Sequence, residues 1–433
     1  YSTSVVITNP SATDVAYGSV NFFAESGDTL DLVVESQRII GVLPFTIRPL
    51  GSVAFTGTRD FRLTTGSVRI SSTAPIGAAV EFGSAALGIA GVGENPPAVS
   101  MILPITRDAA KGVNTGVAMS NPQVAGVDVS VTLYTLDGVV PSGGSRTVQL
   151  PPNGHYAAFV NEIFPNVLVD SFQGTMVIRS LTTGKQISAV ALQLGANPGE
   201  FTTLPVVPIS QPSATTELLL PQFANGNGFS SSVFLVNASE TATSGIVQFI
   251  DDAGIPLNLS LGGSEVSSVT ASLAPVGAAV FTSSGTGALV AGWAAVNGSS
   301  TIGGMVRFTA PGLGIAGVGA ARPVGAFITP VSRSVNSKFS TGIAVISTQA
   351  GGTLIMTLRD QGGVVLPNGQ IAVQMAARGH IARFIEELFP AADTREFQGT
   401  LTVSSDHGPI AGMAIQLGSR AGEFTTLPVT EVR

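Results

Sequence analysis

The feature that most constrains this chain is an internal repeat with a period of about 110 residues. A signature segment, in which apolar side chains alternate with small or polar ones, occurs four times, at 2–9, 114–121, 230–237 and 340–347. A repeat of this period indicates several small domains of one kind rather than a single large catalytic domain. The length of 433 residues gives each of four copies enough chain to bury its own core.

The four copies are of two alternating types. Each contains a second strand that ends in a glycine turn, at 20–27, 131–138, 247–254 and 355–362, and this pattern predicts a hairpin. Further along, a turn glycine precedes a phenylalanine, as Gly51 precedes Phe55, and the separation is four, five, four and five in successive copies. Only the second and fourth copies contain a predicted helical turn ended by proline, at 159–165 and 384–390.

The closing segments of the copies follow the same alternation. The first and third copies share Leu-Gly-Ile-Ala-Gly-Val-Gly at 87–93 and 313–319, whose glycines we expect to allow either a bulge or close backbone approach in a strand. The second and fourth share Gly-Glu-Phe-Thr-Thr-Leu-Pro at 199–205 and 422–428. We therefore predict an all-β fold of four tandem antiparallel immunoglobulin-like β-sandwiches in the order A-B-A-B. The predicted domains are copy one (1–96), copy two (97–208), copy three (209–322) and copy four (323–433).

Several short motifs recur with the copies. Asn-Pro ends the signature strand at Asn9 and Asn121, and Phe-Gln-Gly-Thr occurs at 172–175 and 397–400. Together with the hairpin turns, these motifs resemble those of bacterial secreted or surface proteins built of tandem immunoglobulin-like β-sandwich repeats. The resemblance covers the whole chain, but its motifs mark turns and strands. It implies an extracellular setting and carries over no catalytic residue.

The composition excludes several classes of protein. Charged residues are 11% and apolar residues 44% of the chain, and the net charge is −7, whereas disorder requires low hydrophobicity and high net charge. The most apolar stretch, 277–296, is interrupted by hydroxyl residues and glycines, so no membrane span is expected. Lysine occurs only at Lys111, Lys185 and Lys338, which argues against a nucleic-acid partner.

The absence of cysteine rules out a disulfide framework. It leaves open either a reducing compartment or a secreted protein that packing alone stabilises. The chain begins at Tyr1 rather than at methionine, so an upstream segment was removed or is not shown, and we favour a secreted protein. The predicted location is extracellular or on the cell surface.

The best candidates for catalysis are two histidines at equivalent positions of the repeat. His155 lies seven residues before Glu162, as His380 does before Glu387, and a histidine–carboxylate pair can serve as a general base and its orienting group. No nucleophile recurs at a fixed spacing, so we expect these histidines to bond locally and the protein not to be an enzyme. We predict no catalytic, cofactor or metal site; the acidic pair 251–252 is more typical of a solvated turn than of calcium binding.

Copy three has an unusual run without charge. No charged side chain occurs from Val266 to Val306. Soluble domains normally protect sheet edges with charge, especially lysine. We therefore predict that partner subunits cover this copy, against the alternative of a hydroxyl-rich surface that stays monomeric.

Copy one lacks a strand that the other copies have. An apolar strand with proline precedes the signature at 101–104, 218–221 and 327–330, whereas the first signature opens the chain. A sandwich without this strand has unpaired backbone groups and an open core, so we predict that another subunit supplies a strand. The best donor is the tail, 424–433. The predicted assembly residues are Tyr1, Val5 and Ile7 on the acceptor side and Phe424, Leu427, Val429 and Val432 on the donor side.

These observations predict a structural subunit of an extracellular filament or surface assembly. Head-to-tail strand pairing is heterologous and generates a homopolymer when the rotation does not close. The alternative function is a cell-surface adhesin or a carbohydrate-binding stalk, with surface glycans as partners, although Trp293 is the only tryptophan available for sugar stacking. The alternative for the missing strand is that unseen residues of the same chain cap the edge.

Overall fold

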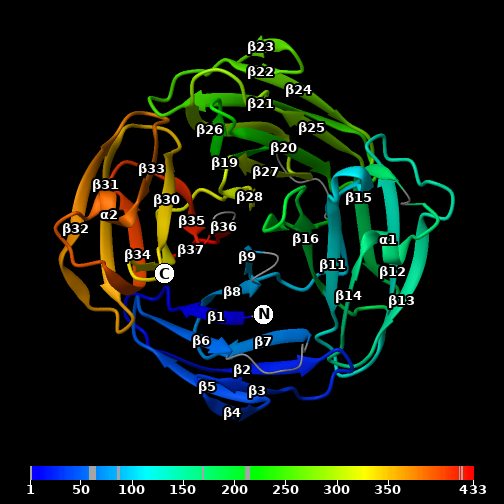
Figure 1. Ribbon diagram of the computed structural model, residues 1–433, viewed down its shortest axis with the longest axis horizontal. Helices are drawn as coiled ribbons and strands as arrows, with labels where there is room; N and C mark the ends of the chain where they lie inside the picture. The colour runs from blue at the N-terminus through cyan, green and yellow to red at the C-terminus, as the bar shows by residue number, and fades with distance from the viewer. Residues whose placement is uncertain are drawn as a thin grey trace.

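The computed structural model describes residues 2–57, 65–84, 88–167, 170–209, 215–418, 420 and 423–433. The chain is all-β, with antiparallel sheets and two short α-helices among these residues. Figure 1 shows that copies one to four follow one another around a common centre and that copy four lies beside copy one. The repeat thus closes into a ring, an arrangement that the repeat alone had not predicted.

Copies one and two contain the strands β1 to β18. Those of copy one are β1 (Ser2–Thr8), β2 (Ala16–Ala24), β3 (Asp31–Val34), β4 (Gln37–Ile40), β5 (Val42–Ile47), β6 (Ser52–Gly57), β7 (Gly66–Ser72), β8 (Gly77–Ser84) and β9 (Gly88–Gly93). The elements of copy two are β10 (Ser100–Asp108), η1 (Ala109–Lys111), β11 (Asn114–Ser120), β12 (Val127–Thr135), β13 (Ser145–Leu150), β14 (His155–Phe159), α1 (Val160–Ile163), β15 (Ser171–Ser180), β16 (Ser188–Leu194), β17 (Phe201–Leu204) and β18 (Val207–Pro208).

Copies three and four contain the strands β19 to β37. Those of copy three are β19 (Thr215–Asn225), β20 (Ser230–Asn237), β21 (Thr243–Asp251), β22 (Leu259–Leu261), β23 (Ser264–Val266), β24 (Ser268–Leu273), β25 (Ala278–Thr282), β26 (Val290–Ser299), β27 (Ile302–Ala310) and β28 (Gly314–Gly319). The elements of copy four are β29 (Ala326–Ser334), β30 (Phe339–Ser347), β31 (Gly352–Asp360), β32 (Val365–Met375), β33 (His380–Phe384), α2 (Ile385–Leu388), β34 (Glu396–Ser405), β35 (Ile410–Leu417), β36 (Phe424–Leu427) and β37 (Thr430–Glu431).

Copy two shows the β-sandwich-like arrangement most simply. One sheet has the strand order β13-β12-β15-β10-β18 and the other has the order β14-β11-β16-β17. Both sheets contribute to one core, since Leu103 of β10 and Met176 of β15 pack with Val117 and Met119 of β11. The sheet with β12 and β13 lies on the rim of the ring, and the sheet with β11 and β16 lies nearer its centre (Figure 1). In copy four, pairing of β29 with β30 joins the two layers into one sheet.

The signature strands β1, β11, β20 and β30 have the predicted register. All eight apolar positions expected to face the cores are buried, and they are Val5, Ile7, Val117, Met119, Val233, Leu235, Ile343 and Val345. Side chains alternate between the two faces of a strand, so the apolar positions share one face. The predicted helical turns are also confirmed as α1 and α2, where Ile163 and Leu388 point into the cores.

The hairpin of copy four differs from the expected register by one residue. The turn glycines Gly27, Gly138 and Gly254 have positive φ, and in copy four the equivalent residue is Gly363 (φ +81°), not Gly362. The sequence Gln-Gly-Gly allows either alignment. Only the backbone conformation identifies the glycine that the turn requires.

Four strands, one from each copy, meet at the centre of the ring. The amide of Gly91 in β9 donates to Thr425 Oγ1 of β36 at 2.7 Å, and the amide of Gly317 in β28 donates to Thr202 Oγ1 of β17 at 2.8 Å. A Cβ at Gly91 would lie 2.5 Å from the carbonyl oxygen of Thr426. The expected close backbone approach at these glycines is confirmed, and it explains why copies one and three share one closing sequence.

Part of the uncharged run in copy three lies inside this molecule, while other residues of the run, such as Leu289, are exposed. Trp293 and Ala295 pack with Ile346 and Ala411 of copy four, while Met305 packs in the core of copy two. Burial within the ring accounts for the lack of charge at these positions, because an unpaired charge would be costly there. Contact of copy three with partner subunits stays a prediction. The four domain boundaries also stay predictions, because side chains such as Met305 of copy three pack into the core of a neighbouring copy.

Candidate strand-acceptor site

Neighbouring copies are connected by four equivalent joints. In each joint, the hairpin turn of one copy contacts the glycine turn of the next, and a backbone amide of the second copy donates to a carbonyl of the first. The pairs are His155 N to Glu25 O at 3.1 Å, Ala278 N to Leu136 O at 3.0 Å, His380 N to Asp252 O at 3.1 Å and Ser52 N to Gln361 O at 3.0 Å. The last pair joins copy four to copy one and closes the ring.

Each joint also contains a residue in the left-handed region, directly before the turn glycine. These residues are Leu50 (φ 56°), Asn153 (φ 53°), Val276 (φ 48°) and Arg378 (φ 54°). In three joints the carbonyl of this residue accepts a side-chain hydrogen bond from the preceding copy. The donors are Thr175 Oγ1 to Val276 at 2.7 Å, Thr400 Oγ1 to Leu50 at 2.7 Å and Trp293 Nε1 to Arg378 at 2.9 Å.

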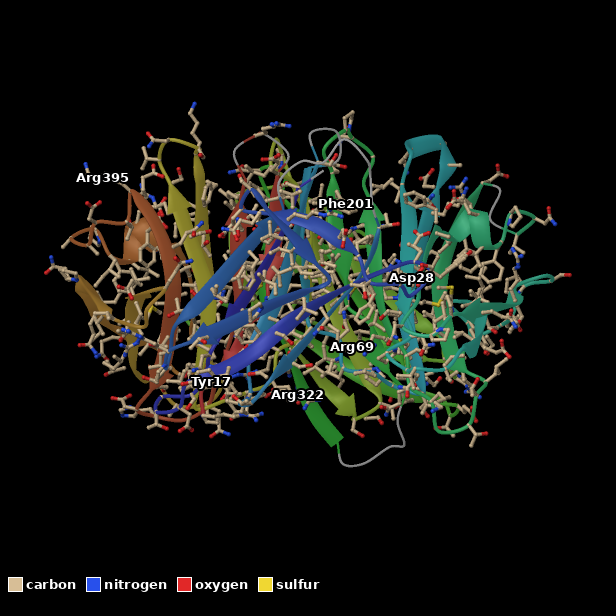
Figure 2. All side chains as sticks on the ribbon, turned by 90° about the horizontal axis from the view of Figure 1, so that it is seen from below. Tyr17, Asp28, Arg69, Phe201, Arg322 and Arg395 are labelled. Atoms are coloured by element: carbon tan, nitrogen blue, oxygen red, sulfur yellow. The ribbon has the colours of Figure 1, made fainter. Side chains whose placement is uncertain are left out.

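The joint between copies one and two differs. At the position of those three donors copy one has Ser67, and the contact is made instead by Arg69, whose Nη2 donates to Asn153 Oδ1 at 3.0 Å. The Arg69 guanidinium also lies 5.0 Å from the ring centroid of Phe23. Figure 2, with copy one in front, shows Asp28 of the hairpin turn beside the strands of copy two.

In the other three joints, the strand before the signature fills the space between the copies. This first strand is β10, β19 or β29, and it pairs with β15, β26 or β34 of its own copy. One aliphatic side chain of each first strand points toward the next copy, and these three residues, Ile102, Leu219 and Ile328, are fully buried. Ile102, for example, packs against Val236 and Ala278 of copy three.

Copy one has no such strand among its described residues. Its β7 is equivalent to β15, β26 and β34, yet the sheet ends at β7 in the order β5-β2-β7. The amide of Thr73 donates to Tyr17 O at 2.8 Å, so the odd-numbered residues of β7 bond to β2. The amides and carbonyls of Val68 and Ile70 therefore point to the edge of β7 with which no described strand pairs, and both side chains are only half-buried.

The facing surface of copy two is correspondingly less covered. Ala118 and Ser120 of β11 and Ser188 and Val190 of β16 are half-buried. The equivalent positions in copies three and four are all buried, and they are Phe234, Val236, Gly303, Met305, Ala344, Ile346, Ala411 and Met413. We name the edge of β7 and these four residues of copy two the acceptor site. Its chemistry is that of strand addition, with backbone donors and acceptors beside an apolar face.

The tail that we expected to be a donor is engaged within its own chain. β36 pairs with β35 and β37 with β29. The amide of Arg433 donates to Pro10 O at 3.0 Å, and the amide of Ala12 donates to Arg433 O at 3.1 Å. The tail thus reaches copy one, as expected from the repeat, but it reaches copy one of the same molecule.

The other predicted assembly residues are mostly interior. Val5 and Ile7 lie in the core of copy one, and Phe424 and Leu427 are buried near the centre of the ring. Val429 and Val432 are half-buried, and Tyr1 lies outside the described residues. Their role in assembly stays a prediction. The unpaired residues of β7 were missed, although their position follows once the absent strand is matched to its expected partner.

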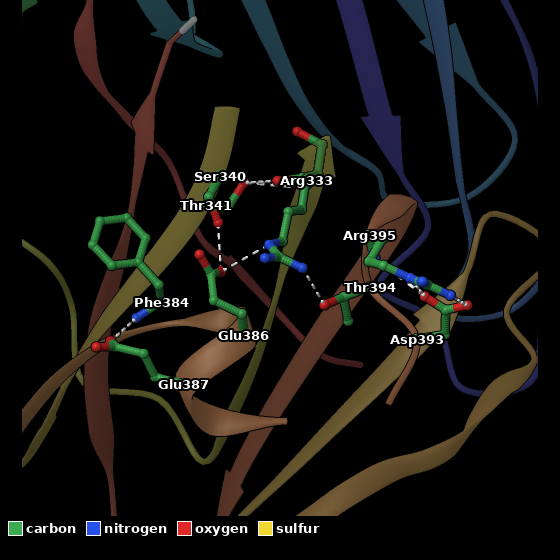
Figure 3. A network of polar contacts seen from close by, with 10 residues as sticks. Arg333, Ser340, Thr341, Phe384, Glu386, Glu387, Asp393, Thr394 and Arg395 are labelled. Carbon is green, nitrogen blue, oxygen red and sulfur yellow. Dashed lines mark hydrogen bonds and ion pairs between the residues drawn. The ribbon is translucent and has the colours of Figure 1, made fainter. Parts of the chain in front are cut away.

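The histidine–glutamate pairs do not form. Glu162 Oε2 accepts from the amide of Phe159 at 2.7 Å. Figure 3 shows the equivalent bond in copy four, where Glu387 Oε2 accepts from the amide of Phe384 at 2.8 Å. Both glutamates therefore cap the short helices. His380 instead bonds through Nδ1 to Asp252 Oδ1 of copy three at 2.8 Å, and burial lowers the pKa of His155, with the nearby Glu25 opposing this shift.

The remaining polar clusters also stabilise turns and joints. Asp251 Oδ1 accepts from the amides of Ala253 and Ile255, as expected for a turn. Figure 3 shows Glu386 accepting from Ser340 Oγ at 2.6 Å and pairing with Arg333 at 3.4 Å, which ties α2 to β29 and β30. Within the described ranges, no group of three or more acidic, histidine or cysteine side chains could hold a metal ion.

No protein-family model and no curated protein matches this chain. Among solved structures, a chain described as "The Triple Jelly Roll Fold and Turret Assembly in an Archaeal Virus" is 13% identical over 94% of this chain and 91% of its own length. Its TM-score is 0.13, which is too low to indicate a shared fold. In the part of the chain that the structure describes, no helix is both long and apolar enough to cross a membrane.

Proposed function

We propose that this protein is a structural subunit of an extracellular filament or surface assembly, in which a partner polypeptide adds a strand at β7. The observation that carries the proposal is the inequality of the four joints. Three of them hold a buried first strand, whereas the edge of β7 pairs only with β2 among the described residues. An open sheet edge offers backbone donors and acceptors to another strand, and the added strand would also remove the adjacent apolar face from water.

The proposal includes the finer fold and setting. We propose that the copies are four immunoglobulin-like sandwiches of the kind that bacteria secrete or display in tandem. Two antiparallel layers sharing one core, as in copy two, support this assignment. The low charge and the absence of cysteine are compatible with a secreted protein that packing stabilises.

The engaged tail changes which segment we propose as the donor. Donation by 424–433 to a second molecule would first require β36 and β37 to leave their own sheet. A strand from elsewhere in the partner polypeptide avoids that cost. Homopolymers joined head to tail remain within the proposal, and the identity of the partner is an outcome of the experiment below.

The adhesin alternative has no specific observation in its favour. Sugar-binding surfaces commonly use exposed aromatic rings. Trp293 is fully buried, and its Nε1 donates to Arg378 O within the joint between copies three and four. This tryptophan therefore has a structural role.

A self-complemented chain tests the proposal. Residues 99–113 contain β10 and its connection to β11, and a second copy of them in place of Tyr1 would supply the first strand of copy one. The parent should form filaments or larger particles in negative-stain electron microscopy and light scattering, and the self-complemented chain should stay single. The matched control carries aspartate at the position equivalent to Ile102, which opposes burial of the strand. The proposal fails if the parent stays single at all concentrations, or if the self-complemented chain assembles as the parent does.

A further inference from the structure

We infer that the strand that completes β7 runs antiparallel to it, with a proline opposite Ser67 and a large aliphatic residue opposite Arg69. This inference rests on the proposed function and specifies the partner of the same site. It identifies the ligand as an extended peptide with two or three apolar residues before a proline, as in 101–104, 218–221 and 327–330. It also fixes the register in which that peptide lies.

The register comes from the three first strands that are present. In copy two Pro104 lies opposite Thr175, and in copy four Pro330 lies opposite Thr400. Both threonines are equivalent to Ser67. The pairs Val20–Ile70, Val131–Ile178 and Met356–Val403 have the same position in the repeat, and the residue three before the second member is Ser67, Thr175 and Thr400, respectively. In copy three a bulge after Leu220 places Pro221 and its neighbour opposite Trp293, the third equivalent position.

The hydrogen-bond pattern explains why proline fits there. The amide of Ser180 donates to Val99 O at 2.8 Å. Hydrogen-bonded pairs recur at every second residue of an antiparallel ladder, so Met101 and Leu103 are also hydrogen-bonded to β15. Pro104 falls between such pairs, and its nitrogen faces away from β15. A proline at this position removes no ladder bond. Ser67 bonds to β2, so a residue opposite it on the open edge has the same geometry.

The aliphatic position is defined by what the first strands bury. Ile102 lies opposite Val177, Leu219 opposite Ala295 and Ile328 opposite Thr402, and each of these three aliphatic residues is fully buried. In copy one the equivalent of Val177 is Arg69. The neighbours of Arg69, Val68 and Ile70, point to the other face of β7, toward the core. The equivalent residues of copy two are Met176 and Ile178, which pack with Leu103 and Met101 of the first strand.

The tail of this chain meets only part of the pattern. Placing Pro428 opposite Ser67 would put Leu427 on the core-facing side, which suits the site. It would put Thr426 at the position of Ile102, where all three observed residues are large and aliphatic. A threonine there would bury less apolar area and a hydroxyl group. The pattern of β10 is therefore a better match than that of the tail.

A synthetic peptide with residues 99–109 of this chain is the probe. Labelled peptide is added to the parent protein, and binding is measured by fluorescence anisotropy. We expect saturable binding that Ile102→Asp in the peptide weakens at least about tenfold, because the charge would be buried without a partner. Equal binding of the two peptides would overturn the inference.

Because the chain has no cysteine, disulfide trapping can read the register. Ser67→Cys in the protein should cross-link to a peptide with Pro104→Cys, since residues at non-hydrogen-bonded positions of an antiparallel pair lie close enough for a disulfide. The controls are the peptide with Leu103→Cys, whose side chain points to the other face, and the protein with Ser71→Cys, four residues away. Equal trapping in the controls, or none with the matched pair, would overturn the register.

The outcomes separate this inference from the proposed function. If the peptide binds in register but the parent never assembles, the inference stands and the proposed function fails. If the parent assembles and the peptide neither binds nor competes with assembly, the inference fails.

Discussion

The backbone amide of Ser52 donates to the carbonyl of Gln361, 3.0 Å away, across the joint between copy one and copy four. This bond has the same position in the repeat as the three bonds that connect consecutive copies. The ring is therefore closed by the contact that also connects its consecutive units. Four predictions test the closing joint, the carboxyl group of Glu81 and the tail.

The first prediction concerns the hairpin glycine of the closing joint. A Cβ at Gly363 would lie 2.3 Å from the carbonyl oxygen of Pro49, so Gly363→Ala should lower the free energy of unfolding by about 2–4 kcal/mol through strain and displacement. Urea unfolding measures this change. Gly262→Ala is the matched control, because Gly262 also has positive φ but has open space around it, and it should cost about 1 kcal/mol. Equal effects would mean that the joint does not resist displacement.

The second prediction concerns the side-chain bond of the same joint. Thr400→Val keeps the shape of the side chain but removes the donor to Leu50 O, and it should lower the free energy of unfolding by about 1–3 kcal/mol. Thr147→Val on an exposed strand should change it by less than about 0.5 kcal/mol. Thermal and urea unfolding check both variants. A neutral Thr400→Val would show that water replaces the lost donor.

The third prediction concerns pH. Desolvation raises the pKa of Glu81 to about 7, although a hydrogen bond from Gln416 opposes the shift. The folded state therefore favours protonated Glu81, so its contribution is greatest below pH 4.5 and is lost as the pH rises through about 7. At pH 8, Glu81→Gln should therefore have a higher free energy of unfolding than the parent, and this advantage should be smaller at pH 5. The difference should be on the order of 1–2 kcal/mol, because Glu81 is partly exposed and solvent weakens the effect. Urea midpoints at both pH values test this; an unchanged pH dependence in the variant would contradict it.

The fourth prediction concerns the tail. Removing 429–433 deletes β37 and the bonds of Arg433 to Pro10 and Ala12, so it should cost about 2–4 kcal/mol of unfolding free energy. Arg433→Ala keeps the backbone bonds and should have little effect. If the truncated protein remains folded and still assembles, residues 429–433 are not needed as the donor. If it folds but no longer assembles, the tail regains its place as the candidate donor.

Much of the architecture could be predicted from local patterns. Alternation in the signature strands identified Val5, Ile7 and their equivalents as core residues, because side chains on a strand point alternately to two faces. The shared glycines of 87–93 and 313–319 indicated close backbone approach, which a Cβ would prevent at Gly91 and Gly317. That the described residues of copy one include no strand before the signature was also readable, because the three other copies have one.

The closure of the ring was decided only in the tertiary structure. Whether the tail meets copy one of the same molecule or of another depends on the rotation between successive copies, and that rotation is set by joints such as Ser52–Gln361. Such contacts join residues far apart in the sequence and leave no periodic signal in it. For the same reason, the sequence alone could not show whether the uncharged residues around Trp293 are buried within the ring or between subunits. The sequence by itself determined the strands and the faces on which their apolar side chains lie. The angles between copies decided which surfaces remained uncovered.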